Sequence, residues 1–135
     1  MTPLMFAKLF AATAPVLLVL DYLWLGVIAK KFYRAQMGSL LRTDVQLGPA
    51  LLFYLLFITA LLVLAVQPAL ERESVGRAVL LGALLGLVAY GAYDLVNLAT
   101  LRGFPLSVAI VDMAWGTAVS AVVAGWAFTA ARWLG

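Results

Sequence analysis

The sequence contains no cysteine and no histidine. Without cysteine the chain cannot form a disulfide, an iron–sulfur cluster or a thiol nucleophile. Without histidine it has no imidazole to ligate haem or zinc or to act as an acid–base catalyst near neutral pH. We therefore expect no cofactor and no transition-metal site, and no recognisable catalytic nucleophile remains.

Charged residues are also scarce, at 11% of the 135 residues against about 25% in a typical soluble domain. Hydrophobic residues make up 66%, where about 45–50% is usual. A soluble domain of this size leaves much of its surface in water and could not hide so much apolar surface. The composition therefore predicts an integral membrane protein. The net charge of +3 is small and scattered, which gives no support to nucleic-acid binding.

Four apolar stretches are long enough to cross the hydrocarbon core, which requires about 20 residues of helix. Helices are expected because lipid offers no partner to an unpaired backbone donor or acceptor. Short connections make neighbouring helices antiparallel. The fold class predicted is all-α, a single polytopic domain over residues 1–135 in which four transmembrane helices form an antiparallel bundle. The spans cover about residues 9–29, 48–66, 78–98 and 106–128.

The loops carry most of the charge and bear on orientation. Lysine and arginine number five on the side of the first and third loops and four on the other side. This difference is a weak positive-inside signal for both termini outside the cytoplasm, and dual insertion stays open. The first loop also has an amphipathic pattern, and it either forms a helical turn in the interface or stays irregular. The apolar residues of this pattern are Phe32, Tyr33, Met37, Leu40 and Leu41.

Three acidic residues lie inside the predicted spans: Asp21, Asp94 and Asp112. Each costs roughly 2.5–3.5 kcal/mol at a helix centre, so each needs a structural or functional reason. Counted from the nearest loop residue at 1.5 Å per residue, all three lie about 10–13 Å below the same interface. The second span has no acid. Three helices therefore each place one carboxyl group at nearly the same depth, where they can meet inside the bundle.

The acids on the third and fourth spans end stripes of small residues. Gly82, Gly86, Tyr90 and Asp94 recur every four residues and share one helix face. A matching stripe on the fourth span runs from Asp112 through Gly116, Ser120 and Ala124. Because a GxxxG pattern lets another helix approach closely, these two stripes predict that the third and fourth spans pack together.

Side chains able to bond the acids lie nearby in the sequence. Asn97 follows Asp94 by one turn, and Trp24 and Trp115 follow the other two aspartates at the same spacing. An indole N–H can donate to a carboxylate, and the indole ring can contact a cation or an apolar ligand. For Trp24 a place in the interfacial aromatic belt is equally compatible with the sequence. Further hydroxyl donors are Tyr22, Tyr90 and Tyr93, whereas Tyr54 on the second span is interpreted as structural.

The negative charge of the three aspartates can be balanced in more than one way, and several interpretations stay open. Arg102 and Lys30 lie at the same end of the bundle and can extend inward. Arg102 begins a tight turn directly above Asp94 and Asp112, which makes it the best candidate gate or counter-ion. The acids then either form a satisfied structural network, or bind a proton, a cation or a cationic ligand, or lie on different helix faces. Burial and crowding of like charges favour the protonated form of a carboxyl group, which suits proton carriage.

Three sequence blocks carry a family resemblance. They are the run DYLWLG from Asp21, the run YDLVNLATLRGFPL from Tyr93, and the run DMAWG from Asp112. The chain resembles an uncharacterised bacterial family of small, four-span inner-membrane proteins with a domain of unknown function. The resemblance spans nearly the whole chain. It implies a multi-pass protein of the bacterial inner membrane and implies no reaction.

Two functions of different class follow. The first is a small proton- or cation-linked transporter or ion-binding protein that uses the aspartates as its sites. Oxygen ligands suit a proton or a hard cation better than a soft metal. The second is a non-catalytic accessory subunit of a larger membrane complex, with the aspartates as a structural polar network. The expected partners are the lipid bilayer and either further copies of this chain or other membrane subunits. A lipid-directed enzyme is the weakest alternative.

Overall fold

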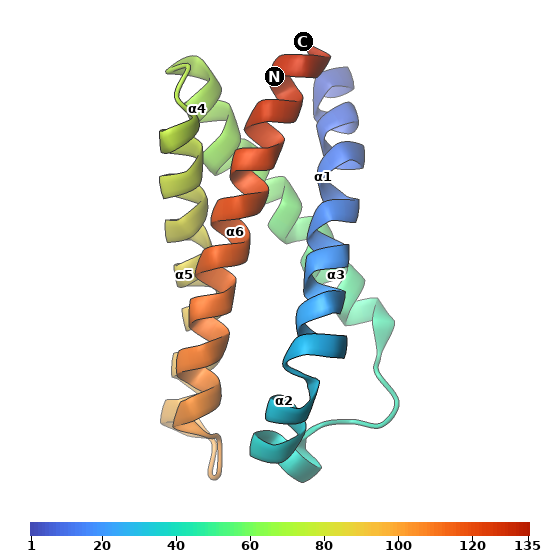
Figure 1. Cartoon of the computed structure of the whole chain (residues 1–135), viewed down its shortest axis with the longest axis vertical. Helices are drawn as coiled ribbons and strands as arrows, with labels where there is room; N and C mark the ends of the chain where they lie inside the picture. Colours follow the sequence, from blue (N-terminus) through green and yellow to red (C-terminus); the bar gives the residue numbers. More distant parts are fainter.

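Four long helical runs account for most of the chain in the computed structural model, which describes all 135 residues and contains no strand (Figure 1). The first and second runs each include a short π-helical segment, and a separate short helix, α2 (Lys30–Met37), follows the first run. The runs are α1 (Pro3–Leu23) with a π-helical segment (Trp24–Ile28), α3 (Leu47–Leu61) with a π-helical segment (Leu62–Val66) and α4 (Gln67–Glu71), α5 (Val75–Thr100) and α6 (Leu106–Leu134).

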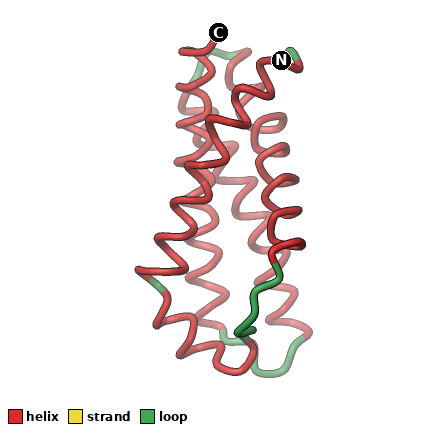
Figure 2. Tube along the Cα trace, turned by 90° about the vertical axis from the view of Figure 1, so that its right-hand side faces the viewer, coloured by secondary structure: helices red, strands yellow, loops and turns green.

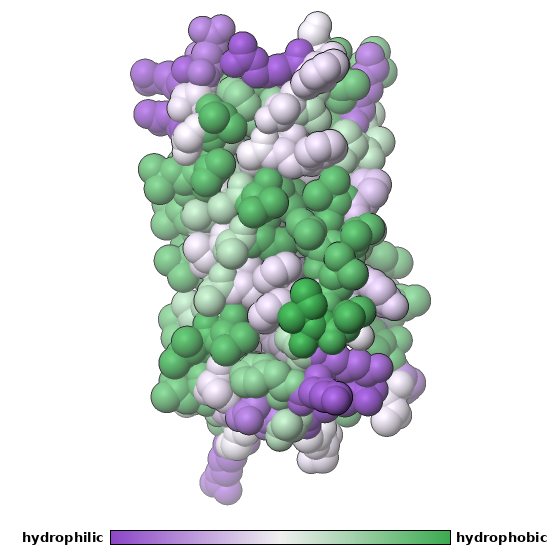
Figure 3. Space-filling model, viewed as in Figure 1, coloured by the Kyte–Doolittle hydropathy of each residue, from purple (hydrophilic) through white to green (hydrophobic).

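Each run is long and apolar enough to cross a membrane, which confirms the predicted all-α, four-span bundle. The spans extend a few residues beyond most of the predicted limits: Pro3–Ile28, Leu47–Glu71, Val75–Thr100 and Leu106–Leu134. The two termini lie at one end of the bundle, and α2 lies at the other (Figures 1 and 2). The surface has the pattern that lipid requires, with an apolar belt between two hydrophilic ends (Figure 3).

The helix ends follow local capping rules. The Thr2 side chain accepts a hydrogen bond of 3.1 Å from the backbone N–H of Met5, and Pro3 occupies the first turn, where its missing N–H is harmless. At the start of α5 the Ser74 side chain accepts from the N–H of Arg77 at 3.1 Å. Gly103 has a φ of +78° in the turn before α6, a conformation that L side chains rarely adopt. These caps place the span ends where the charged loops begin.

Helices α5 and α6 form the most closely packed pair, as their small-residue stripes predict. Gly82 and Gly86 of α5 lie directly against the α6 backbone. A Cβ atom added at Gly82 would lie 2.7 Å from the carbonyl oxygen of Ser120, and one added at Gly86 would collide with the carbonyl oxygen of Gly116. The absence of side chains at these glycines therefore brings Asp94 and Asp112 to one seam.

The second span crosses the bundle obliquely (Figure 1). Its first half, α3, contacts α1, whereas its π-helical continuation packs against α5 and α6. Burial increases along the span, since Leu51 and Leu52 near the start of α3 are exposed, while Ile58, Leu61 and Leu62 further along are buried. The first half of α3 therefore does not close over α5, and the bundle stays loosely packed at the depth of the aspartates.

Candidate functional site

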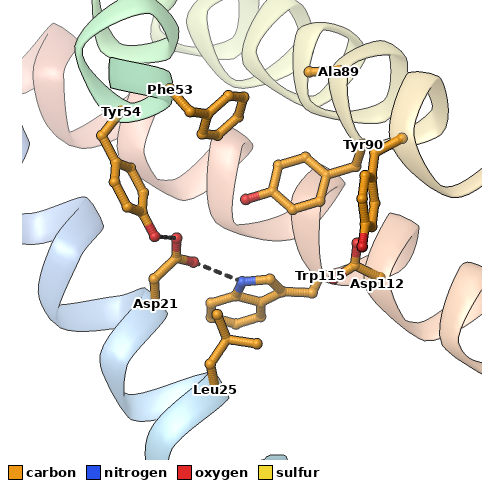
Figure 4. A pocket seen from close by; sticks show the side chains of 9 residues that line it. Asp21, Leu25, Phe53, Tyr54, Ala89, Tyr90, Asp112 and Trp115 are labelled. Carbon is orange, nitrogen blue, oxygen red and sulfur yellow. Dashed lines mark hydrogen bonds between the residues drawn. The ribbon is translucent and has the colours of Figure 1, made fainter. Parts of the chain in front are cut away.

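A cavity of about 280 Å³ lies at this loosely packed level, between the end of the first span and helices α3, α5 and α6 (Figure 4). We call it the acid cavity. Two of the three aspartates, Asp21 and Asp112, line it from different sides, and most of the remaining wall is aromatic. Its lining residues are Asp21, Leu25, Phe53, Tyr54, Ala89, Tyr90, Tyr93, Asp112 and Trp115.

Asp21 is held on one side of the acid cavity by two donors from different helices (Figure 4). Trp115 Nε1 of α6 donates to Asp21 Oδ1 at 2.9 Å, and the Tyr54 hydroxyl of α3 donates to Asp21 Oδ2 at 2.5 Å. The Asp21 side chain is 5% exposed. A buried carboxyl group that accepts two hydrogen bonds ties the first, second and fourth spans together at one point.

Asp112 has its own donor, which comes from outside the spans. The Tyr33 hydroxyl of α2 donates to Asp112 Oδ1 at 2.8 Å and accepts from Trp24 Nε1 at 3.2 Å. Tyr33 is buried against Phe104 and Val108, so α2 packs over the end of the bundle. Burial raises the pKa of the Tyr33 hydroxyl well above its ordinary value, which keeps the donor protonated.

Asp94 is the exception among the three acids. Its side chain is 0% exposed, and neither carboxyl oxygen has a hydrogen-bond partner. The carboxyl group of Asp112 lies beside it, close enough for the two carboxyl groups to share a hydrogen bond when one of them is protonated. No cation of the protein balances these acids, because the single ion pair in the chain joins Arg42 and Asp44 in an exposed loop at 3.2 Å. A buried polar group in this condition needs an explanation beyond packing.

The interior of the acid cavity is aromatic with one free donor. The Tyr90 hydroxyl points into the cavity (Figure 4), and the tyrosine hydroxyls that form hydrogen bonds are those of Tyr33 and Tyr54. Its ring packs edge-on against Phe57 and lies where Gly116 leaves room for it. Tyr93 and Phe53 line the cavity with exposed side chains, so its wall continues to the lipid-facing surface beside α3.

Several residues that the sequence nominates take other positions. Tyr22 is 68% exposed and hydrogen-bonds no acid, and neither Tyr90 nor Tyr93 does so. Asn97 does not bond Asp94, whose oxygens have no partner. Arg102 and Lys30 form no ion pair, so the predicted counter-ions are wrong as contacts. Lys30 begins α2 and Arg102 lies in the turn between α5 and α6, and both side chains are exposed, whereas Asp21 and Asp94 are buried.

The donors that do reach the acids are Tyr54 and Tyr33, and sequence reasoning missed both. Tyr54 was predicted to be structural because its span has no acid, yet it donates to Asp21 across the bundle. Tyr33 was placed only in the amphipathic segment, for which a helical turn and an irregular loop were both open, and the structure shows it to be helix α2. A tyrosine flanked by apolar residues gives no sequence signal for such a contact, because its partner lies far away in the chain.

A second cavity, of about 830 Å³, lies beside α2 where the first span ends. We call it the interface cavity. It shares two residues with the acid site, since Leu25 lines both cavities and Tyr33 lines this one while donating to Asp112. Three cationic side chains surround it. Its lining residues are Leu25, Lys30, Tyr33, Arg34, Gly38, Leu41, Arg42, Thr43 and Val45.

No three acidic side chains are grouped closely enough to hold a metal ion. Asp94 and Asp112 are neighbours, whereas Asp21 has a separate set of donors. The chemistry on offer is therefore that of a carboxyl pair beside an aromatic cavity with a third carboxyl group on its far wall. The carboxyl pair can hold a proton, and the aromatic side chains of the cavity can contact a single positive charge.

The chain belongs to the family described as predicted membrane protein, DUF2177, whose family model matches residues 6–129. This match covers most of the chain and confirms the resemblance carried by the blocks around the three aspartates. No curated protein and no solved structure matches the chain. The family description together with the four spans establishes a multi-pass membrane protein.

Proposed function

We propose that this protein is a proton-linked carrier of a small cation, which binds in the acid cavity in exchange for a proton held by Asp94 and Asp112. One observation carries the proposal. Asp94 is fully buried without a hydrogen-bond donor or an ion-pair partner, and the carboxyl group beside it is that of Asp112. Two adjacent carboxyl groups in an apolar seam are stable when one of them keeps a proton.

A cation bound in the acid cavity can replace that proton. Asp112 belongs both to the carboxyl pair and to the cavity wall, so a cation in the cavity lies beside the pair. When the cation binds, its charge replaces that of the departing proton, and the net charge of the site stays constant. This balance matters in a membrane, where an uncompensated charge is expensive.

The wall chemistry favours an organic cation over a metal ion. Seven of the nine lining residues are hydrophobic, and the aromatic side chains in this wall, Phe53 and Trp115 among them, can contact a cation with apolar substituents. A metal ion would need several oxygen ligands at one point, and no such group of side chains exists. The free Tyr90 hydroxyl adds a polar contact to the ligand.

A route for the proton runs through Tyr33. Its hydroxyl touches Asp112 on one side, and its side chain lines the interface cavity on the other. The carboxyl pair is therefore one side chain away from a cavity that opens among charged residues. A hydroxyl that both donates and accepts can relay a proton between the two.

The proposal is tested with tetraethylammonium, a permanent cation that carries no proton of its own. Purified protein is reconstituted in vesicles that contain a pH-sensitive dye, and a tetraethylammonium gradient is applied. We expect movement of protons against the cation, lost in Asp94→Asn and Asp112→Asn and kept in Asp44→Asn, which changes an exposed loop acid. Sodium chloride at equal ionic strength controls for surface effects.

If wild-type vesicles show no cation-driven proton movement, while Asp94→Asn and Asp112→Asn alter only thermal stability, the aspartates are a structural network and the carrier proposal is wrong. Copurification of a membrane partner in fixed stoichiometry would then favour the accessory-subunit alternative.

A further inference from the structure

Cationic side chains distinguish the interface cavity from the acid cavity, which has none in its wall. Its cations are Lys30 and Arg34, one turn apart on α2, and Arg42, which follows in the loop toward α3. Residues at this spacing project from the same side of a helix. Arg42 pairs with Asp44 at 3.2 Å, whereas Lys30 and Arg34 have no carboxylate partner. The cavity therefore has three positive charges and one negative charge beside it.

The depth of the cavity indicates what kind of molecule could fill it. Lys30 comes just after the first span ends at Ile28, so the cations lie where lipid headgroups begin. The remaining wall includes Leu25, Leu41 and Val45, all exposed apolar side chains. Leu25 belongs to the span itself. A ligand that fits this wall has an anionic group at headgroup level and an apolar part that extends into the membrane.

We propose that the interface cavity binds one anionic phospholipid, with its phosphate group at Lys30, Arg34 and Arg42 and its glycerol and first acyl carbons against Leu25, Leu41 and Val45. Basic pockets at the headgroup level of membrane helices bind such lipids through this combination of contacts. A zwitterionic choline lipid fits less well, because its ammonium group would meet three like charges. The cavity volume of about 830 Å³ lies within the range of about 300–1,000 Å³ that is usual for small-molecule sites.

The turn that closes the cavity is built for this position. Gly38 ends α2 with a φ of +53°, which lets the chain reverse so that Leu41 and Arg42 return beside Lys30. Helix α2 is itself anchored on the bundle, because Gln36 accepts a hydrogen bond of 2.7 Å from the Ser107 hydroxyl and Tyr33 donates to Asp112. The cations Lys30 and Arg34 are therefore presented by a fixed helix and not by a loop.

The chain offers a matched control for the charges. The double variant Lys30→Gln/Arg34→Gln removes two cavity cations, and Lys31→Gln/Arg102→Gln removes two cations on the same side of the membrane that do not line the cavity. Protein in phosphatidylcholine nanodiscs is titrated with phosphatidylglycerol, and bound lipid is counted by native mass spectrometry. We expect one tightly held phosphatidylglycerol in the wild type and in the control, and an affinity at least about tenfold lower in the cavity variant.

Two further arms identify the source of the phosphate. The variant Leu41→Asn/Val45→Asn keeps the cations and removes the apolar wall, so lipid binding should weaken although the charge is unchanged. Glycerol 1-phosphate added from water should not displace the lipid. Equal losses in the cavity variant and the control would mean that general surface charge holds the lipid, and displacement by glycerol 1-phosphate would mean a soluble-phosphate site. Either result overturns the proposal, and neither affects the cation-carrier test.

Discussion

The indole rings of Trp24 and Trp115 stack with their centroids 4.7 Å apart and their planes within 5° of parallel. Each indole N–H serves a different part of the acid site, because Trp24 donates to Tyr33, which holds Asp112, and Trp115 donates to Asp21. The stack therefore joins the donor sets of two aspartates on different spans.

Replacing Trp115 with phenylalanine should destabilise the protein by about 1–3 kcal/mol, because Asp21 loses a donor while still buried. Thermal unfolding in detergent measures the effect. The matched control is Trp133→Phe, which changes a tryptophan that is 86% exposed and makes no hydrogen bond, and it should leave the midpoint unchanged. Equal midpoints for the two variants would show that the indole N–H adds nothing to stability.

Replacing Tyr54 with phenylalanine should also cost about 1–3 kcal/mol, because it removes the other donor to Asp21. Tyr22→Phe is the control, since the Tyr22 hydroxyl bonds no acid. Because Tyr54 and Trp115 serve one carboxyl group, their effects should not be additive in a double-mutant cycle. Strict additivity would show that the two donors do not share Asp21 in the membrane.

Tyr33→Phe should change how stability depends on alkaline pH. Burial raises the pKa of Tyr33 above its ordinary value of about 10, so above that pH the unfolded chain loses a proton that the folded protein keeps. The folded state then binds more protons than the unfolded state, and the free energy of unfolding must fall as pH rises. We expect a shallower fall in Tyr33→Phe, measured as thermal midpoints across the alkaline range. An identical fall in both proteins would contradict burial of this hydroxyl.

Gly86→Ala should destabilise the seam between α5 and α6. The added Cβ would meet the Gly116 carbonyl oxygen, and backbone cannot move aside as a side chain can. Overpacking of this kind costs about 1–3 kcal/mol. Gly76→Ala is the control, because its Cβ would meet only Ser74 Oγ at 3.8 Å and alanine favours the helix. A seam that tolerates Gly86→Ala as well as Gly76→Ala would be looser than described.

Much of the fold is predictable because lipid imposes simple requirements. A run of about 20 apolar residues has to be helical, so the four spans can be counted and ordered from the sequence. The seam of α5 and α6 is predictable as well, because glycines at positions 82 and 86 allow a partner helix to approach closely at that face of α5. Even the amphipathic segment that became α2 is visible as a pattern around Phe32 and Tyr33.

The hydrogen-bond partners of the three aspartates were harder to predict from the sequence. Counting from the loops places Asp21, Asp94 and Asp112 at one depth, yet it cannot say which side of each helix faces which neighbour. The rotation of each helix about its axis decides this, and it places Tyr54 and Trp115 within hydrogen-bond distance of Asp21 and no donor beside Asp94. Local spacing nominated Asn97 and Tyr22 instead, because proximity along the chain was the only distance available.

The amino-acid sequence alone determined that this chain is a membrane protein of four helices with three acids at one level, since hydrophobic length and residue spacing are local properties. Only the tertiary structure decided that the second span crosses obliquely, that α2 brings Tyr33 to Asp112, and that an aromatic cavity separates Asp21 from the pair of Asp94 and Asp112. These features depend on helix rotation and crossing, which packing between distant segments sets and no short stretch of sequence encodes.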